Sequence, residues 1–143
     1  MDIVIGCDHA GYEMKEKVKQ YLENKNYSII DVGTASVQSV DYPYYGHEIG
    51  REVAKNKSSK GIAICGSGIG ISIAANKIKG IRAALCTSKE HAEMSRKHND
   101  ANVLALGSRM TSEKDIVSII DVWLSTKFEG GRHLDRINMI EYE

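Results

Sequence analysis

Short apolar runs, rich in β-branched residues, alternate along the chain with segments in which apolar residues recur every three or four positions. The short runs predict strands at residues 2–6, 27–32, 62–65, 81–86 and 103–106. The spacing between them predicts helices, including one at about residues 70–79 and a long last helix through Ile116, Ile120 and Trp123. Parallel neighbours in a sheet need such crossovers, which are right-handed. The pattern therefore predicts an α/β fold, a doubly wound sandwich around a five-stranded parallel sheet.

Local signals mark one helix start and the tail. Thr87 with Glu90 predicts a capping box at the start of the fourth helix. After Phe128 the sequence is polar and glycine-hinged, and it then ends in apolar residues at 137, 139 and 140. We expect such a tail to dock on the body or on a partner subunit. Because no linker interrupts the pattern, we expect a single domain over residues 1–143.

Composition and charge exclude several classes of partner. The chain has 19 Lys and Arg against 19 Asp and Glu, a formal net charge of zero, and lacks the basic excess that nucleic-acid binding requires. No run approaches the ~20 apolar residues of a membrane span. An acid at Asp2 does not fit a signal peptide, so we expect a cytoplasmic protein. Three separated cysteines without a CxxC pair argue against a disulfide framework and a structural zinc site.

Chemistry-bearing residues follow several predicted strands. In open parallel sheets, ligands bind outside the carboxyl ends of the strands. The candidates there are Asp8 and His9 after the first strand, Cys65 to Gly70 after the third, Thr87 and Ser88 after the fourth, and Ser108 and Arg109 after the fifth. We therefore expect one crevice to collect a thiol, a carboxylate, an imidazole, hydroxyls and an arginine.

The segment from Gly66 to Gly70 has alternating glycines at a predicted strand-to-helix turn. Such a turn lets backbone N–H groups converge on an anion at a helix N-terminus. A dinucleotide fingerprint would need a glycine where Ile71 stands and an acid where Cys86 stands, so that reading fails. A tight turn with no ligand explains the glycines equally well.

Cysteine and histidine candidates each have a structural alternative. Cys65 closes a strand before that turn, where a helix dipole favours a thiolate, although a buried structural cysteine is commoner. Cys7 and Cys86 are expected in the core. Asp8 and His9 are suited to polarise a substrate oxygen, but an N-cap acid and a surface histidine are the alternatives.

Cationic and amide side chains occur late in the sequence. His98 and Asn99 close the fourth helix, for which a C-terminal histidine with the asparagine in a left-handed cap is the alternative. Arg132 and Arg136 stand four apart with His133 between them, so one helical turn would aim both guanidinium groups the same way. The interpretations are a phosphate clamp or a solvated surface balanced by Glu129 and Asp135, with Arg109 as a third cation or a salt-bridge partner.

Taken together, these residues resemble the type B ribose-5-phosphate isomerases. The blocks that carry the resemblance are Gly6 to Gly11, Asp41-Tyr42-Pro43, Cys65 to Gly70, Ala74 to Lys77, His98-Asn99, Gly107-Ser108-Arg109, and Arg132-His133 with Arg136. They cover nearly the whole chain. The resemblance implies a Rossmann-like three-layer sandwich with a five-stranded parallel sheet and a C-terminal tail that docks on the partner subunit.

The resemblance also implies a reaction. Cys65 would be the base that moves a proton between C2 and C1 of open-chain ribose 5-phosphate, through a cis-enediolate, to give ribulose 5-phosphate. Ser67 would contact the enediolate oxygens, either shuttling their proton or only binding. The remaining members of this anion hole are the amides of Gly66, Gly68, Ile69 and Gly70. His98 would open the sugar ring with help from Asp8, and Asn99 would bind a hydroxyl or enediolate oxygen.

Phosphate binding and assembly follow from the same resemblance. The implied phosphate ligands are His9, Arg109, Arg132 and Arg136, with His133 and Tyr42 near the pocket. The active sites would be shared in a homodimer, or in a tetramer, with His98, Asn99 and Arg109 facing the Cys65 of a partner chain. A monomer would then be inactive.

The isomerase hypothesis needs neither cofactor nor metal, because a proton transfer requires no hydride acceptor. It has two alternatives. The family also includes isomerases of allose 6-phosphate and galactose 6-phosphate, and the sequence pattern separates five-carbon from six-carbon substrates poorly. A non-catalytic anion- or nucleotide-binding module is the other alternative, and the missing fingerprint acid counts against it.

Overall fold

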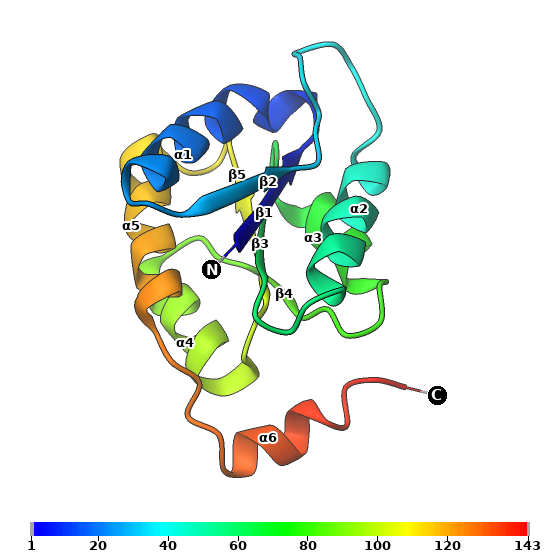
Figure 1. Ribbon diagram of the computed structural model, residues 1–143, viewed down its shortest axis with the longest axis vertical. Coiled ribbons are helices and arrows are strands. Elements are labelled where there is room, and N and C mark those ends of the chain that lie inside the picture. The colour runs from blue at the N-terminus through cyan, green and yellow to red at the C-terminus, as the bar shows by residue number, and fades with distance from the viewer. Residues whose placement is uncertain (1, 143) are drawn as a thin grey trace.

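Five parallel strands form the centre of the protein in a computed structural model that describes residues 2–142 (Figure 1). The strands are β1 (Asp2–Cys7), β2 (Ser28–Asp31), β3 (Lys60–Cys65), β4 (Ala83–Leu85) and β5 (Val103–Gly107). They lie in the order β2-β1-β3-β5-β4, and every neighbouring pair is parallel. The predicted sheet is confirmed, with strand ends shifted by at most two residues.

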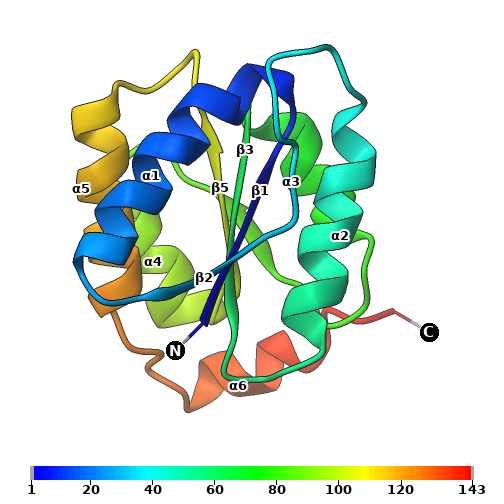
Figure 2. The ribbon, with the colours of Figure 1, turned by 45° about the horizontal axis from the view of Figure 1, so that its top comes forward.

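Helices cover both faces of the sheet (Figure 2). One face is covered by α1 (Tyr12–Asn24), α4 (Lys89–Asn99) and α5 (Glu113–Ser125), and the other by α2 (Tyr42–Ala54) and α3 (Ile69–Asn76). A single 3-10 turn, η1 (His9–Gly11), follows β1. The short α6 (Arg132–Ile137) lies at the end of the molecule where the strands begin (Figure 1). The predicted three-layer sandwich is thereby confirmed.

Alternation along the strands builds a separate core on each face. In β3, Ile62 and Ile64 belong to the core under α1 and α5, whereas Ala63 and Cys65 belong to the core under α2 and α3. Successive strand side chains point to opposite faces, so a strand buried on both sides is apolar throughout. Cys65 therefore faces the layer that contains α3.

Three local details differ from the sequence prediction. The α4 N-cap is Ser88, whose Oγ accepts from the His91 amide at 3.2 Å, so the capping box at Thr87 was wrong by one residue. The third helix ends at Asn76, because that side chain turns to bond both main-chain groups of Ala83 at 2.8 and 2.9 Å. The left-handed residue after α4 is Asp100, not Asn99.

The turns that follow β3 and β5 pack closely against each other. Gly68 has φ +80°, and a Cβ on it would lie 2.6 Å from a Leu85 methyl carbon. A Cβ on Gly107 would lie 2.5 Å from the Ser67 carbonyl oxygen. Only glycine fits at either position. The backbone of Gly68 is left-handed, and at both glycines the space that a Cβ would need is already occupied.

The tail contacts the body of its own chain. The Glu129 amide donates to the Lys97 carbonyl at 3.1 Å, and the Gly80 amide donates to the Glu141 carboxylate at 2.8 Å. Docking of this tail on a partner subunit stays a prediction. Within residues 2–142, none of the helices has the length and apolar character needed to cross a membrane.

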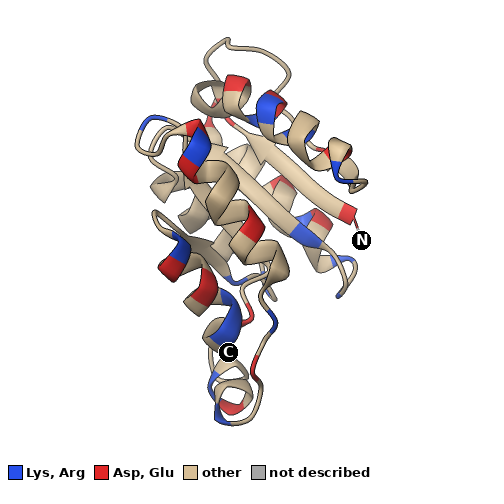
Figure 3. Ribbon diagram, turned by 90° about the vertical axis from the view of Figure 1, so that its left-hand side faces the viewer, with Lys and Arg blue, Asp and Glu red and all other residues tan. Residues whose placement is uncertain are grey.

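Charged residues of both signs are mixed along the helices, while the strands carry few of them (Figure 3). Lys15 of α1 is a charged residue that lies in the interior, since it is 1% exposed. Its Nζ donates to both carboxylate oxygens of Asp31 at 2.8 Å and to the Thr34 carbonyl at 2.7 Å. Burial acts to raise the pKa of Asp31, but hydrogen bonds from Lys15 and Lys19 more than offset it and hold that pKa below its ordinary value.

Replacing the buried ammonium should destabilise the fold. We expect Lys15→Met to lower the free energy of unfolding by about 3 kcal/mol, because it leaves the Asp31 carboxylate and the Thr34 carbonyl without this donor. Urea denaturation at neutral pH measures the change. The matched control is Lys25→Met, which removes an exposed ion pair with Asp121 and should leave the unfolding midpoint nearly unchanged.

The pH dependence has a definite sign. A carboxyl whose pKa is lowered by folding contributes stability above its unfolded pKa and loses it as the pH falls through the folded pKa. The difference between wild type and Lys15→Met should therefore shrink in acid. An unchanged midpoint for Lys15→Met, or a difference that grows on acidification, would contradict the assignment.

Candidate active site

Cys65 lies at the carboxyl end of β3, shortly before the start of α3 in the chain. The side chain is buried, at 5% exposure, and its Sγ accepts a hydrogen bond from the Gly68 amide at 3.1 Å. Burial raises the pKa of Cys7 to about 12 and that of Cys86 to about 11. Both lie in the core as predicted. Cys65 belongs to the core on the other face of the sheet and ends its strand at the glycine turn.

The turn that follows Cys65 also presents backbone amides that lack a backbone partner. The Ile69 amide donates to Ser67 Oγ at 3.1 Å, which leaves the Ser67 hydroxyl proton free to donate elsewhere. Within residues 2–142, the amides of Gly70 and Ile71 have no backbone acceptor. Free amides in the first turn of a helix attract an anion. The predicted cradle is thus narrower than the whole turn, since the Gly68 and Ile69 amides already have acceptors.

Tyr42 and Asp8 border this turn. A Cβ on Gly70 would lie 2.6 Å from the Tyr42 ring, so the ring packs against the first turn of α3. Asp8 is 7% exposed, and its Oδ1 accepts from the Gly11 amide at 3.1 Å. The N-cap alternative for Asp8 is therefore found in the structure, and its second carboxylate oxygen remains for a ligand.

His9 and Arg109 line one hollow of about 430 Å³ beside the turn. His9 Nδ1 accepts from the Val40 amide at 3.1 Å, which fixes the ring proton on Nε2 as a donor for a ligand. Lys17 lines the same hollow and pairs with Glu113 at 3.1 Å. The sequence analysis missed Lys17, although its place two helical turns after Ala10 could have indicated it.

Arg109 lies beside the Cys65 of its own chain. Its amide donates to the Gly66 carbonyl at 2.9 Å, and a Cβ on Gly66 would lie 3.4 Å from the Arg109 side chain. The prediction that Arg109 faces the Cys65 of a partner chain was therefore wrong. The reason is topological: β5 is the direct parallel neighbour of β3, with Gly107 opposite Cys65, so both strands end at the same edge.

The other candidates gather at the opposite end of the molecule. α4 starts beside the carboxyl edge and runs back toward the strand beginnings, so His98 lies about 15 Å along its axis from Ser88. Arg132, His133 and Arg136 are on α6, at that far end (Figure 1). Asn99 is also there, exposed, with its carbonyl accepting from Arg82 Nε at 2.9 Å. One chain therefore does not bring His98 to its own Cys65.

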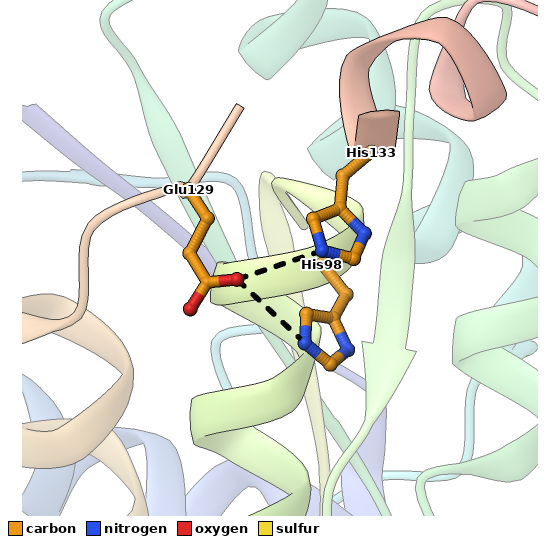
Figure 4. A group of neighbouring side chains, drawn as sticks. All are labelled: His98, Glu129 and His133. Carbon is orange, nitrogen blue, oxygen red and sulfur yellow. Dashed lines mark ion pairs between the residues drawn. The ribbon is translucent and has the colours of Figure 1, made fainter. Parts of the chain in front are cut away.

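His98 and His133 stack at this far end (Figure 4). Their ring centroids are 4.3 Å apart and their planes are 13° from parallel. Both Nε2 atoms face Glu129 Oε1, at 3.9 Å from His98 and 3.5 Å from His133. The sequence analysis took Glu129 only as a balancing charge. Its position four residues before His133 was the available signal.

Comparison with known proteins shows the family of this chain. The family model described as Ribose/Galactose Isomerase matches residues 3–140. Ribose-5-phosphate isomerase B of Escherichia coli is 45% identical over 96% of this chain and 93% of its own length.

Solved structures match equally well. A ribose-5-phosphate isomerase B from Clostridium thermocellum superimposes with a TM-score of 0.96 at 48% identity, covering 98% of this chain and 95% of that one. One from Mycoplasma genitalium with bound ribulose-5-phosphate gives 0.94 at 39% identity, over 97% and 93%. Since sequence and structure agree over almost the whole length, the chain belongs to the ribose/galactose isomerase family.

Proposed function

We propose that this protein interconverts ribose 5-phosphate and ribulose 5-phosphate. The observation that carries the proposal is Cys65, held by an amide hydrogen bond at a strand end beside the free amides of α3. Relatives named as ribose-5-phosphate isomerases support it, and the one from Mycoplasma genitalium holds ribulose-5-phosphate.

In the proposed reaction, Cys65 acts on the open-chain aldose. Its thiolate takes the proton from C2, the C2 electron pair forms the enediolate double bond, and the negative charge develops on the carbonyl oxygen at C1. A proton then returns to C1 from the thiol. The proton on O2 passes to O1, with the Ser67 hydroxyl as the shuttle, so that O1 becomes the C1 hydroxyl and O2 becomes the new carbonyl oxygen. The amides of Gly70 and Ile71 and the Ser67 hydroxyl stabilise the oxygens as their charge develops.

A phosphate handle fixes the substrate relative to the base. His9 Nε2 and the Arg109 guanidinium supply donors from the hollow next to the turn. Arg132 and Arg136 extend from α6 at the other end of the chain, so they serve the site of a second copy. Guanidinium groups suit this task because they bind phosphate oxygens in pairs.

Two copies are needed to complete the site. In the proposed homodimer, a two-fold axis places the strand beginnings of each copy next to the strand ends of the other. His98 and Asn99 of one copy thereby reach Cys65 of the other, where His98 opens the ring with Asp8. Exposed apolar side chains beside the turn support such a contact: Ile69 is 53% exposed and Ile73 is 55% exposed, one helical turn apart. A tetramer would require a further interface. A cytoplasmic location stays a prediction.

Substrate choice is tested by a direct comparison. We expect turnover of ribose 5-phosphate at a kcat/KM at least about tenfold above that of allose 6-phosphate and galactose 6-phosphate, because the rigid sheet edge fixes the span between phosphate hollow and base. A coupled assay with all three sugars measures it. A preference for a six-carbon sugar would establish that alternative, and inactivity with all three would favour a non-catalytic module.

Removal of the base tests the assignment of Cys65. We expect Cys65→Ala to lower kcat about a thousandfold, since it removes the proton acceptor. The matched control is Cys86→Ala, which removes a thiol from the core on the opposite face of the sheet and should keep most of the activity. Circular dichroism checks that both variants fold. Near-normal turnover in Cys65→Ala would exclude it as the base.

Complementation tests the shared site. Cys65→Ala and His98→Asn should each be nearly inactive alone. After the two are unfolded and refolded together, half of the dimers are mixed, and each mixed dimer has one intact site of two. We therefore expect about a quarter of wild-type activity. If activity does not return although mass spectrometry detects mixed dimers, the two residues do not act across the interface.

A further inference from the structure

We propose that Glu129 and His133 are positioning residues that hold the His98 imidazole ready to open the sugar ring. This inference rests on the proposed isomerase function. It assigns a role to Glu129, and it assigns His133 a role other than phosphate binding.

The side chains of His98, Glu129 and His133 form a cluster in which they differ in exposure to solvent. The His133 side chain is 12% exposed, whereas those of His98 and Glu129 are 42% and 50% exposed. His133 is therefore enclosed, with one face of its ring covered by His98 at a centroid distance of 4.3 Å. A ring enclosed in this way is poorly placed to reach a phosphate on another subunit. It is well placed to restrict the rotation of the outer ring.

The backbone places the three residues together. The Glu129 amide donates to the Lys97 carbonyl at 3.1 Å, which fixes Glu129 against the last turn of α4, next to His98. Gly130 and Gly131 then take positive φ angles of 70° and 59°. These two backbone conformations turn the chain, so that α6 begins at the next residue and His133 lies beside His98.

Charge directs the carboxylate to the two rings. The neighbouring cation on α4, Lys97, already pairs with Glu93 at 2.6 Å. Glu129 Oε1 instead faces the Nε2 atoms of His133 and His98 at 3.5 and 3.9 Å (Figure 4). A carboxylate attracts an N–H and repels a lone pair, so it favours the orientation in which both Nε2 atoms carry the proton.

The same three side chains would also be considered as a metal site, since their ligand atoms lie within 4.8 Å of one another. The ring geometry argues against it. A metal ion binds the lone pair of an imidazole nitrogen and therefore lies near the plane of that ring. Two rings stacked with planes 13° apart do not share such a point unless one of them turns. The carboxylate is held by electrostatic attraction at 3.5 and 3.9 Å, which, unlike metal coordination, does not require the oxygen to lie in both ring planes.

Ring opening is the step that needs this positioning. It takes the proton from the anomeric hydroxyl, breaks the bond between C1 and the ring oxygen, and delivers a proton to that oxygen. Enolisation by Cys65 does not involve these atoms. A defect in positioning His98 should therefore slow the formation of cyclic aldose and spare proton exchange in the ketose.

The experiment starts from ribulose 5-phosphate, which has no free hydroxyl that could close a five-membered ring, in D2O. Two rates are measured by NMR: deuterium incorporation at C1 of the ketose, which reports enolisation, and formation of ribose 5-phosphate. The variants are Glu129→Gln and His133→Ala, with His98→Asn as the reference. The matched control is Asp135→Asn, which removes a carboxylate of α6 that has no ion pair within residues 2–142.

We expect Glu129→Gln and His133→Ala to lower aldose formation at least about tenfold, with exchange changed less than about twofold, as in His98→Asn. Asp135→Asn should match wild type. Retained exchange also shows that a variant is folded and assembled.

Equal loss of both rates, or no change in either rate, would overturn the positioning role. The same would follow if wild type treated with EDTA showed the Glu129→Gln pattern, because a bound metal would then be responsible. Wild type that performs neither exchange nor isomerisation would instead refute the proposed function itself.

Discussion

Main-chain hydrogen bonds between neighbouring turns hold Cys65 in place. The amides of Ser108 and Arg109 donate to the carbonyls of Cys65 and Gly66, both at 2.9 Å. The Ser108 hydroxyl donates to the Ala10 carbonyl at 2.7 Å, which ties the turn after β1 to the same assembly. Because β1, β3 and β5 are adjacent and parallel, their three turns meet at one edge, and a shift in any of them would move the sulfur. Preorganisation of this kind allows an enzyme to stabilise a developing charge without rearrangement.

The same topology separates the candidate site residues of one chain into two groups, which the proposed homodimer would bring together. A helix that crosses back between parallel strands must end at the strand beginnings, so His98 at the end of α4 lies away from Cys65. The cations divide in the same way. His9 and Arg109 lie at the carboxyl edge, whereas Arg132 and Arg136 lie on α6, which explains how a chain with zero net charge can supply a cationic pocket when two copies combine.

Sequence periodicity was sufficient to predict the five strands, the order of elements and the position of Cys65 before a glycine turn. It could not predict pairings between distant residues. Lys15 is a polar position in a helix, and nothing local indicates that Asp31, 16 residues away, would bury it. Glu129 likewise gains its interactions only when α6 returns to the end of α4. Arg109 was misplaced for another reason. That expectation came from the family resemblance, although the strand order alone places Arg109 beside the Cys65 of its own chain.

The division of the site separates two properties of the proposed enzyme. The span from the phosphate hollow of His9 and Arg109 to the Cys65 sulfur lies within one chain, between turns joined by main-chain hydrogen bonds, and therefore changes little with assembly. That span determines which carbon of a phosphorylated sugar meets the base. The position of His98 depends instead on the contact between subunits and on the support of His133. In the proposed enzyme, substrate length is thus determined partly within one chain, through His9 and Arg109, and partly by Arg132 and Arg136 of the second copy, whereas ring opening depends entirely on the assembly.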